Sequence, residues 1–196
     1  MKRFKFSGII LAAGKGKRFG SKKQHAILDG RELYEYPLRI AREFLDEVIV
    51  VGKDIEGGNT RQKSVLRGLR AITGDYVIIL EAARPLVTKE QIELLKKAVT
   101  NHWSTTLCRV PTNTIYSLGK YMRSICCELL VPQAFNTKLL ITAHEKTSIT
   151  NALDDTCLMK DVFSINPHFI ETGNNLHKVT YPEDLEIIKT LYESIN

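Results

Sequence analysis

The sequence predicts an α/β protein with a doubly wound, mostly parallel sheet, and two observations lead to this fold class. Short apolar runs alternate with amphipathic helical patterns along most of the chain, which is typical of βαβ units with right-handed crossovers. The first apolar run also leads directly into a glycine-rich loop, as expected where an open sheet binds a ligand at the carboxyl ends of its strands. With 196 residues and no internal repeat or linker, the chain is expected to form a single domain over residues 1–196.

Three strands and two helices are expected in the first part of the chain. The strands are short runs rich in β-branched residues: Ser7–Leu11, Glu47–Val51 and Tyr76–Leu80. A helix is expected over Arg31–Phe44, irregular near Pro37. Asn59 or Thr60 is expected to cap the next helix. The buried face of that helix would carry Val65, Leu69 and Ile72.

Helix-start signals organise the remainder of the chain. Thr88–Gln91 is a capping box that opens a helix, and its buried side would carry Ile92, Leu95 and Val99. A strand is expected at Thr105–Val110 and a helix at Thr137–His144. Thr180–Glu183 is a second capping box that opens a last helix, with Leu185, Ile188 and Leu191 at core spacing.

The segment at about 113–127 breaks this alternation. It favours β structure and contains Gly119-Lys120, a plausible hairpin tip, so we expect a protruding β-arm. A protruding arm would leave its apolar residues unburied by its own domain. These residues are Ile115, Tyr116, Tyr121 and Ile125. Either a partner covers this arm or it folds back on its own domain as a plain hairpin.

Composition excludes several classes of protein. No apolar stretch has the roughly 18–20 residues that span a bilayer, and the basic start lacks the cleavage site of a signal peptide. The four cysteines have no zinc spacing and are expected to be reduced, and the five histidines are scattered. Much of the net charge of +6 lies in the first 25 residues, where a small anion explains it as well as nucleic acid does. We therefore expect a cytoplasmic protein that binds neither membrane nor nucleic acid.

The glycine-rich loop Leu11–Gly20 is the most informative feature. Gly14, Gly16 and Gly20 expose backbone N–H groups after the first strand. Five cations follow within ten residues of Gly14: Lys15, Lys17, Arg18, Lys22 and Lys23. This concentration of charge fits a polyphosphate, although the loop has neither the Walker spacing nor the dinucleotide fingerprint. The competing interpretation is a solvated basic turn.

Three further motifs contain chemistry-bearing residues. In Gly57–Val65 a glycine turn meets a helix start, so that Gly58 permits close approach of a flat ligand and Ser64 can hydrogen-bond its edge; alternatively, this is only a capped helix. Glu81–Pro85 follows a strand, where a carboxylate can bind a Mg²⁺-phosphate group and Arg84 a second phosphate, or the two form a surface pair. Lys178 precedes the last helix, a position at which most lysines are merely solvated.

Together these motifs closely resemble the 2-C-methyl-D-erythritol 4-phosphate cytidylyltransferase family and its relatives that make CDP-ribitol. The resemblance runs nearly end to end and in the family's order. It is carried by Ala12–Arg18 with Lys23-Gln24, Gly57–Arg61 with Ser64-Val65, Glu81–Pro85, Val131–Phe135 and Lys178–Leu185. It implies a Rossmann-like nucleotidyltransferase fold, a homodimer and use of Mg²⁺.

The resemblance also implies a role for each matched residue. The positions that bind CTP would be Ala12, Ala13, Gly14, Gly16, Gly58, Asn59 and Ser64. Arg18 and Lys23 would hold the triphosphate and stabilise the pentacoordinate α-phosphorus, as the catalytic residues. Glu81 would lie on the metal side. The acceptor phosphate would be bound by Arg84 and Lys178 and, from an arm exchanged across the dimer, by Thr114 and Arg123.

The implied reaction transfers CMP from CTP to 2-C-methyl-D-erythritol 4-phosphate in isoprenoid precursor synthesis. The products would be 4-diphosphocytidyl-2-C-methyl-D-erythritol and pyrophosphate. Ribitol 5-phosphate or another polyol phosphate is an alternative acceptor, and a nucleotide-binding homologue with little turnover is an alternative function. The chain departs from the family in having Glu81 for an aspartate, Leu153 for a threonine and Lys22 for a proline, and in its short link from Val51 to Gly57.

Overall fold

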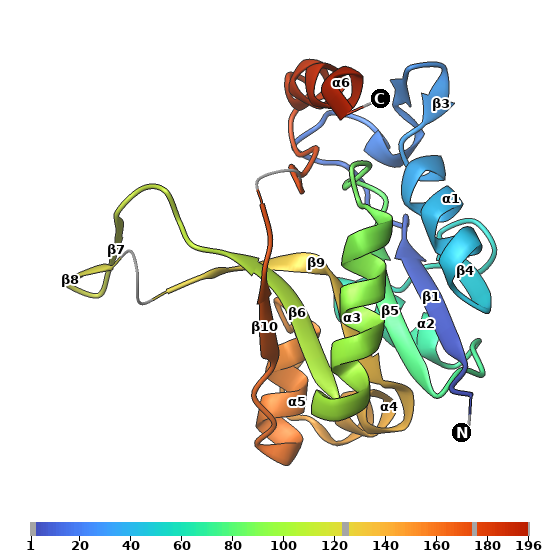
Figure 1. The fold of residues 1–196 in the computed structure, drawn as a ribbon, viewed down its shortest axis with the longest axis vertical. Coiled ribbons are helices and arrows are strands. Elements are labelled where there is room, and N and C mark those ends of the chain that lie inside the picture. Colours follow the sequence, from blue (N-terminus) through green and yellow to red (C-terminus); the bar gives the residue numbers. More distant parts are fainter. Residues whose placement is uncertain (1–2, 123–125, 174–175, 196) are drawn as a thin grey trace.

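The computed structural model describes residues 3–122, 126–173 and 176–195. Over these residues the strands form one six-stranded sheet in the order β10-β6-β9-β5-β1-β4, with two small two-stranded sheets beside it (Figure 1). The strands of the main sheet are β1 (Phe6–Leu11), β4 (Glu47–Val51), β5 (Tyr76–Glu81), β6 (Ser104–Arg109), β9 (Glu128–Asn136) and β10 (His168–Glu171). Only β9 runs antiparallel to its neighbours in this sheet. The expected fold class is confirmed.

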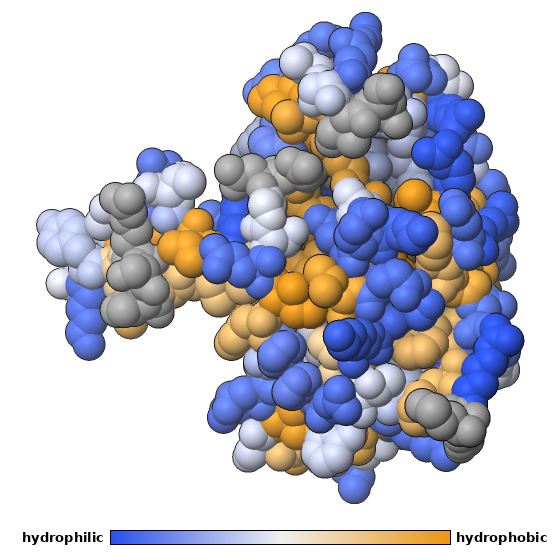
Figure 2. Space-filling model, in the orientation of Figure 1, coloured by the Kyte–Doolittle hydropathy of each residue, from blue (hydrophilic) through white to orange (hydrophobic). Residues whose placement is uncertain are grey.

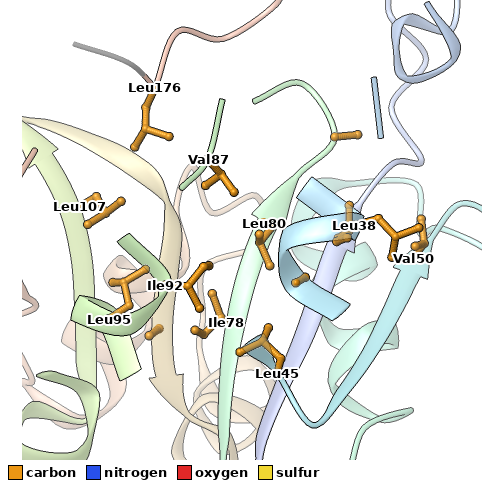
Figure 3. Packing of buried hydrophobic residues seen from close by; sticks show 14 of the residues in the cluster. Leu38, Leu45, Val50, Ile78, Leu80, Val87, Ile92, Leu95, Leu107 and Leu176 are labelled. Atoms are coloured by element: carbon orange, nitrogen blue, oxygen red, sulfur yellow. The ribbon is translucent and has the colours of Figure 1, made fainter. Parts of the chain in front are cut away.

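Helices cover both faces of this sheet. They are α1 (Glu35–Phe44), α2 (Arg61–Leu69), α3 (Lys89–His102), α4 (Thr137–Lys146), α5 (Asp155–Phe163) and α6 (Asp184–Ile195), with a 3-10 turn at Lys23–His25. One buried cluster joins α1 and α3 to the sheet, and a second joins α2, α4 and α5 to the other face. In Figure 3, Ile92 and Leu95 of α3 pack towards Ile78 and Leu80 of β5. The apolar periodicity of each helix therefore builds the core, as the sequence predicts.

The connections around β1 create the crevice in which ligands bind in such folds. β1 pairs in parallel with β4 on one side and with β5 on the other. The chain therefore connects β1 through α1 to β4 on one side. It then passes back over β1 through α2 to reach β5 on the other side. The strand order reverses at this point, which leaves an open space beyond the carboxyl ends of β1 and β5. α6 packs over this end of the molecule in a third apolar cluster with Leu28, Leu33, Tyr36, Leu86 and Val179 (Figure 1).

The first predicted helix is too long by four residues. Ile27–Leu28 (β2) and Arg31–Glu32 (β3) form a small hairpin, and α1 begins only at Glu35. Asp29 and Gly30 form its turn with φ of 45° and 74°. An Asp-Gly pair is the standard signal for such a two-residue turn, because both positions need positive φ. Pro37 lies in the first turn of α1, where a proline is tolerated.

The helix-start predictions had mixed outcomes. Thr60 caps α2 by accepting a hydrogen bond from the Lys63 N–H, and Thr88 and Gln91 form the expected capping box. The predicted box at Thr180–Glu183 is wrong. The Thr180 hydroxyl donates to the Lys178 carbonyl, and Asp184 instead accepts from the N–H groups of Thr180 and Tyr181 at 2.7 and 2.9 Å. The carboxylate of Asp184, one position after Glu183, is a stronger hydrogen-bond acceptor than the hydroxyl of Thr180.

Two further elements differ from prediction. α2 ends at Leu69, so Ile72 lies beyond the helix, although it still packs in the same buried cluster. β9 was not foreseen as a strand. Pro132 is tolerated there because the register with β6 shifts between Thr106 and Leu107, so that Val131 and Pro132 bulge out of the ladder.

The β-arm is present where the sequence predicts it. β7 (Ile115–Ser117) and β8 (Lys120–Met122) form a hairpin that extends from the body (Figures 1 and 2). Its tip is Leu118-Gly119, one residue before the predicted pair, with φ of 49° and 78°. Leu118 is 97% exposed, and Tyr116 and Tyr121 contact each other but remain largely open to solvent. Ile125 lies outside the described residues.

Across the described ranges, no helix combines the length and apolar character needed to cross a membrane.

Candidate active site

A pocket of about 460 Å³ lies at the carboxyl ends of β1 and β5. Its walls come from the glycine-rich loop, the turn before α2, the end of β5 and the segment before α6. Of the residues predicted for the site, those that line it are Ala12, Ala13, Gly14, Gly16, Arg18, Lys23, Gly58, Asn59, Ser64, Glu81 and Lys178. The structure thus brings together residues that are up to 166 positions apart in the chain. Its location matches the crevice created by the strand order.

The glycine-rich loop is fixed by its own backbone. The Gly16 carbonyl accepts hydrogen bonds from the N–H groups of Phe19 and Gly20, both at 2.9 Å. Gly16 has a φ of 63°, and a Cβ there would lie 1.7 Å from the Ser21 carbonyl oxygen. Only glycine fits this position. Gly14 differs, because a Cβ on it would meet no atom within 4 Å. The open space beside Gly14 is where a ligand can approach the backbone.

The turn before α2 packs tightly against this loop. A Cβ on Gly57 would lie 2.2 Å from the Ala13 Cβ, and one on Gly58 would lie 2.4 Å from the Lys63 Cβ. The Ser64 hydroxyl oxygen accepts from the Gly58 N–H and donates to the Thr60 carbonyl, both at 3.0 Å. Ser64 therefore holds the turn in shape, and the close packing leaves no room for a side chain at Gly57 or Gly58.

The cations of the loop differ in their surroundings. Lys15, Lys17 and Arg18 are exposed, and the Arg18 guanidinium lies 5.8 Å from the centre of the Tyr181 ring. Lys23 is half-buried, and its ammonium donates to the Val179 carbonyl at 2.7 Å. Burial lowers the pKa of Lys23 to about 8, with further lowering from the nearby charges of Lys178, Arg18 and Arg84 and an opposing effect of Glu81. Lys23 thus lies in strongly positive surroundings that favour an anion.

Glu81 lies at the centre of a cluster of charges at the end of β5. Its carboxylate contacts the Lys178 ammonium at 2.6 Å and the Nε atoms of Arg84 and Arg61 at 3.6 and 3.9 Å. The side chain of Glu81 is only 12% exposed. Burial alone would raise its pKa, but Lys178, Arg84 and Arg61 outweigh burial and lower it. The carboxylate is therefore ionised and surrounded by three cations.

Two predicted residues lie outside the pocket walls. Arg84 contacts Glu81, with its side chain 11% exposed and hydrogen-bonded to the Leu176 carbonyl. Thr114 is exposed at the start of the arm and does not line the pocket of its own chain. Arg123 lies outside the described residues.

Sequence reasoning assigned no role to a buried ion-pair network behind the pocket. Arg61 lines the pocket and donates to Asp155 at 2.6 Å, and His144 contacts the other oxygen of Asp155 at 3.1 Å. Arg61 belongs to the glycine-turn motif, so its place at the site was recognisable. Its partner is 94 residues away in the chain, and no local pattern pairs them.

Within the described part of the chain, the pocket has few acidic side chains that could bind a metal ion. Over the described residues, no three His, Cys, Asp or Glu side chains lie close enough together to hold a metal. Glu81 is the one acidic residue among the described residues that line the pocket. Mg²⁺ in phosphate-binding sites commonly uses one or two carboxylates, with phosphate oxygens and water as the other ligands. The donor set therefore fits a magnesium ion that arrives with a nucleotide.

Comparisons with known proteins agree with this fold and pocket. The sequence model of the 2-C-methyl-D-erythritol 4-phosphate cytidylyltransferase family matches residues 53–194. Proteins of that name from Aquifex aeolicus and Thermotoga neapolitana are each 32% identical, over 95% and 93% of this chain and 97% and 95% of their own. The crystal structure of the Thermus thermophilus enzyme superposes with a TM-score of 0.81 at 25% identity, covering 94% of this chain and 98% of that one.

Fold, pocket and relatives together define a nucleotidyltransferase. More narrowly, the chain belongs to the 2-C-methyl-D-erythritol 4-phosphate cytidylyltransferase family.

Proposed function

We propose that this enzyme transfers CMP from CTP to 2-C-methyl-D-erythritol 4-phosphate and releases pyrophosphate. The observation that carries the proposal is the pocket itself. It joins a glycine-rich loop with exposed cations to a second group of cations around Glu81. The first can hold a triphosphate, and the second can hold the phosphate of an acceptor. These are the two anions that such a transfer must bring together.

The residues would act through position and charge. With cytosine against the turn at Gly58 and the triphosphate along the loop, the α-phosphorus would lie near Arg18 and Lys23. An oxygen of the acceptor's phosphate attacks that phosphorus, a new P–O–P bond forms, and the bond to the β-phosphate breaks, so that pyrophosphate leaves. No covalent intermediate with the protein is needed, since the developing charge is offset by the cations. Bound Mg²⁺, held by Glu81 and the phosphates, would neutralise further charge.

The acceptor phosphate would lie against Lys178 and Arg84. Both cations already contact Glu81, at 2.6 and 3.6 Å, which fixes their positions before the substrate arrives. Thr114 and Arg123 are proposed to reach the same phosphate from the arm of the second subunit of a homodimer. The exposed tyrosines and Leu118 of the arm support this, because apolar hairpins that stand in solvent usually have a partner.

Turnover with defined substrates tests the proposed function. The purified protein is incubated with CTP, Mg²⁺ and either 2-C-methyl-D-erythritol 4-phosphate or ribitol 5-phosphate, while pyrophosphate is measured. We expect release with the first acceptor, and CTP used far better than UTP, ATP or GTP. Pyrophosphate only with ribitol 5-phosphate would show a different acceptor, and none with either would contradict the proposal.

Subunit mixing tests the shared site. An Arg123→Ala protein should bind CTP and dimerise, but show a sharply raised KM for the acceptor. Mixing it with an Arg84→Ala protein should restore part of the activity, because the heterodimer regains one site with both arginines. A monomer by light scattering, or no rescue after verified subunit exchange, would contradict the exchange of the arm.

We also propose that the reaction takes place in the cytoplasm. The support is in the sequence, whose four cysteines are expected to be reduced, as in most proteins of a reducing compartment. Cell fractionation followed by immunodetection would test this.

A further inference from the structure

A chain of polar and charged side chains, most of them buried, leads from the second helical layer to the acceptor side of the pocket. It begins at His144 of α4, continues to Asp155 at the start of α5 and to Arg61 at the start of α2, and reaches Glu81 at the end of β5. The side chains of His144 and Asp155 are both 0% exposed. These contacts connect three helices to the one carboxylate that holds Lys178 and Arg84.

We infer that Arg61 is a positioning residue for the acceptor-phosphate site and acts through Glu81. This inference rests on the proposed function. Arg61 is anchored on one side by Asp155 at 2.6 Å and faces Glu81 on the other at 3.9 Å. Glu81 thereby lies between Arg61 and the two cations proposed to bind phosphate.

Asp155, the anchor of Arg61, is fully buried and ionised. Burial alone would raise the pKa of Asp155, but Arg61 and His144 outweigh burial and lower it. Asp155 also belongs to the first turn of α5, whose N-cap is Asp154. Fixed in this way, Asp155 holds the guanidinium of Arg61 in one orientation.

Two observations favour action through Glu81 over direct contact with substrate. The Nη2 atom of Arg61 is inaccessible to solvent, and its Nη1 atom is already engaged by Asp155. The Nε atom, in contrast, faces the carboxylate of Glu81. With Arg61 present, part of the negative charge of Glu81 is balanced from behind. Without it, Glu81 would bind Lys178 and Arg84 more tightly and compete with the acceptor phosphate for them.

Arg61→Lys is the variant that tests this inference. A lysine keeps a positive charge near Asp155, so the buried carboxylate stays paired and the protein is expected to fold. It lacks the planar fork that spans Asp155 and Glu81. We expect KM for 2-C-methyl-D-erythritol 4-phosphate to rise about tenfold, with kcat and KM for CTP changed less than about twofold. Arg70→Lys is the matched control, because Arg70 pairs with Glu145 of α4 at an exposed site away from the pocket.

A double-mutant cycle separates positioning from a general structural effect. If Arg61 acts through Glu81, adding Arg61→Lys to Glu81→Gln should raise the acceptor KM by less than about twofold. If turnover of Glu81→Gln is too slow, the same cycle is measured by calorimetric titration of the acceptor. Equal effects in both backgrounds, or an unchanged KM in Arg61→Lys, would overturn the inference. Wild-type protein that releases no pyrophosphate would instead overturn the proposed function.

Discussion

The two groups of cations at the pocket are built in opposite ways. Lys15, Lys17 and Arg18 of the glycine-rich loop are exposed and form no ion pair in the described part of the chain. Arg61, Arg84 and Lys178, in contrast, surround Glu81 and are partly or largely buried. Cations without an ion pair give up no carboxylate when they bind a triphosphate, whereas paired ones already have a fixed geometry. This contrast indicates that the loop supplies charge and the Glu81 cluster supplies position.

The largest effect is expected at the cations nearest the α-phosphorus. Arg18→Ala or Lys23→Ala should lower kcat on the order of 100-fold, because each cation is proposed to bind the transition state better than the ground state. Steady-state kinetics at saturating CTP and acceptor measures this. Lys22→Ala is the control, since Lys22 is an exposed cation of the same loop outside the pocket walls. Wild-type turnover in either variant would remove that residue from the catalytic role.

Gly14→Ala tests whether the triphosphate lies on the loop. A Cβ at Gly14 meets no protein atom within 4 Å, so the melting temperature should not change. It would, however, occupy the space beside the backbone that the triphosphate needs, and KM for CTP should rise about tenfold. Gly173→Ala is the matched control, because Gly173 is equally open and lies away from the pocket. Equal KM values for the two variants would place the nucleotide elsewhere.

The pH dependence of the reaction should report on Lys23. Its pKa is lowered to about 8 in the free protein, mainly by burial, so the ammonium loses its proton as the pH rises through this value. Because the charged form binds phosphate, kcat/KM for CTP should fall about tenfold per pH unit above about pH 8. Lys23→Arg should remove this alkaline decline, since arginine stays charged. A decline that persists unchanged in Lys23→Arg would assign it to another group.

Local sequence patterns predicted the parts of the molecule that depend on local physics. The strand-to-glycine turn after Leu11, the Thr60 cap and the capping box at Thr88 are set by residues a few positions apart, and all three are present. The turn residues Asp29-Gly30 also indicated a hairpin, but the helical pattern that follows led to the prediction of a helix from Arg31. Such errors arise where two local signals compete.

Long-range features were not accessible in this way. β9 carries Pro132 inside a buried strand, and only its bulge against β6 makes this possible. The contacts of Arg61 with Asp155 and of Glu81 with Lys178 join residues 94 and 97 positions apart, so they follow from the topology of the sheet. The motifs therefore identified most of the residues that line the pocket, but not which of them pair with one another.

The division between the two groups of cations is tested most directly by measuring both kinetic constants in Arg18→Ala and Arg84→Ala side by side. The expected result is a kcat lowered on the order of 100-fold in Arg18→Ala with little change in acceptor KM. In Arg84→Ala we expect an acceptor KM raised about tenfold or more, with most of kcat retained at saturation. The same constant altered in both variants would contradict separate roles for the loop and the Glu81 cluster.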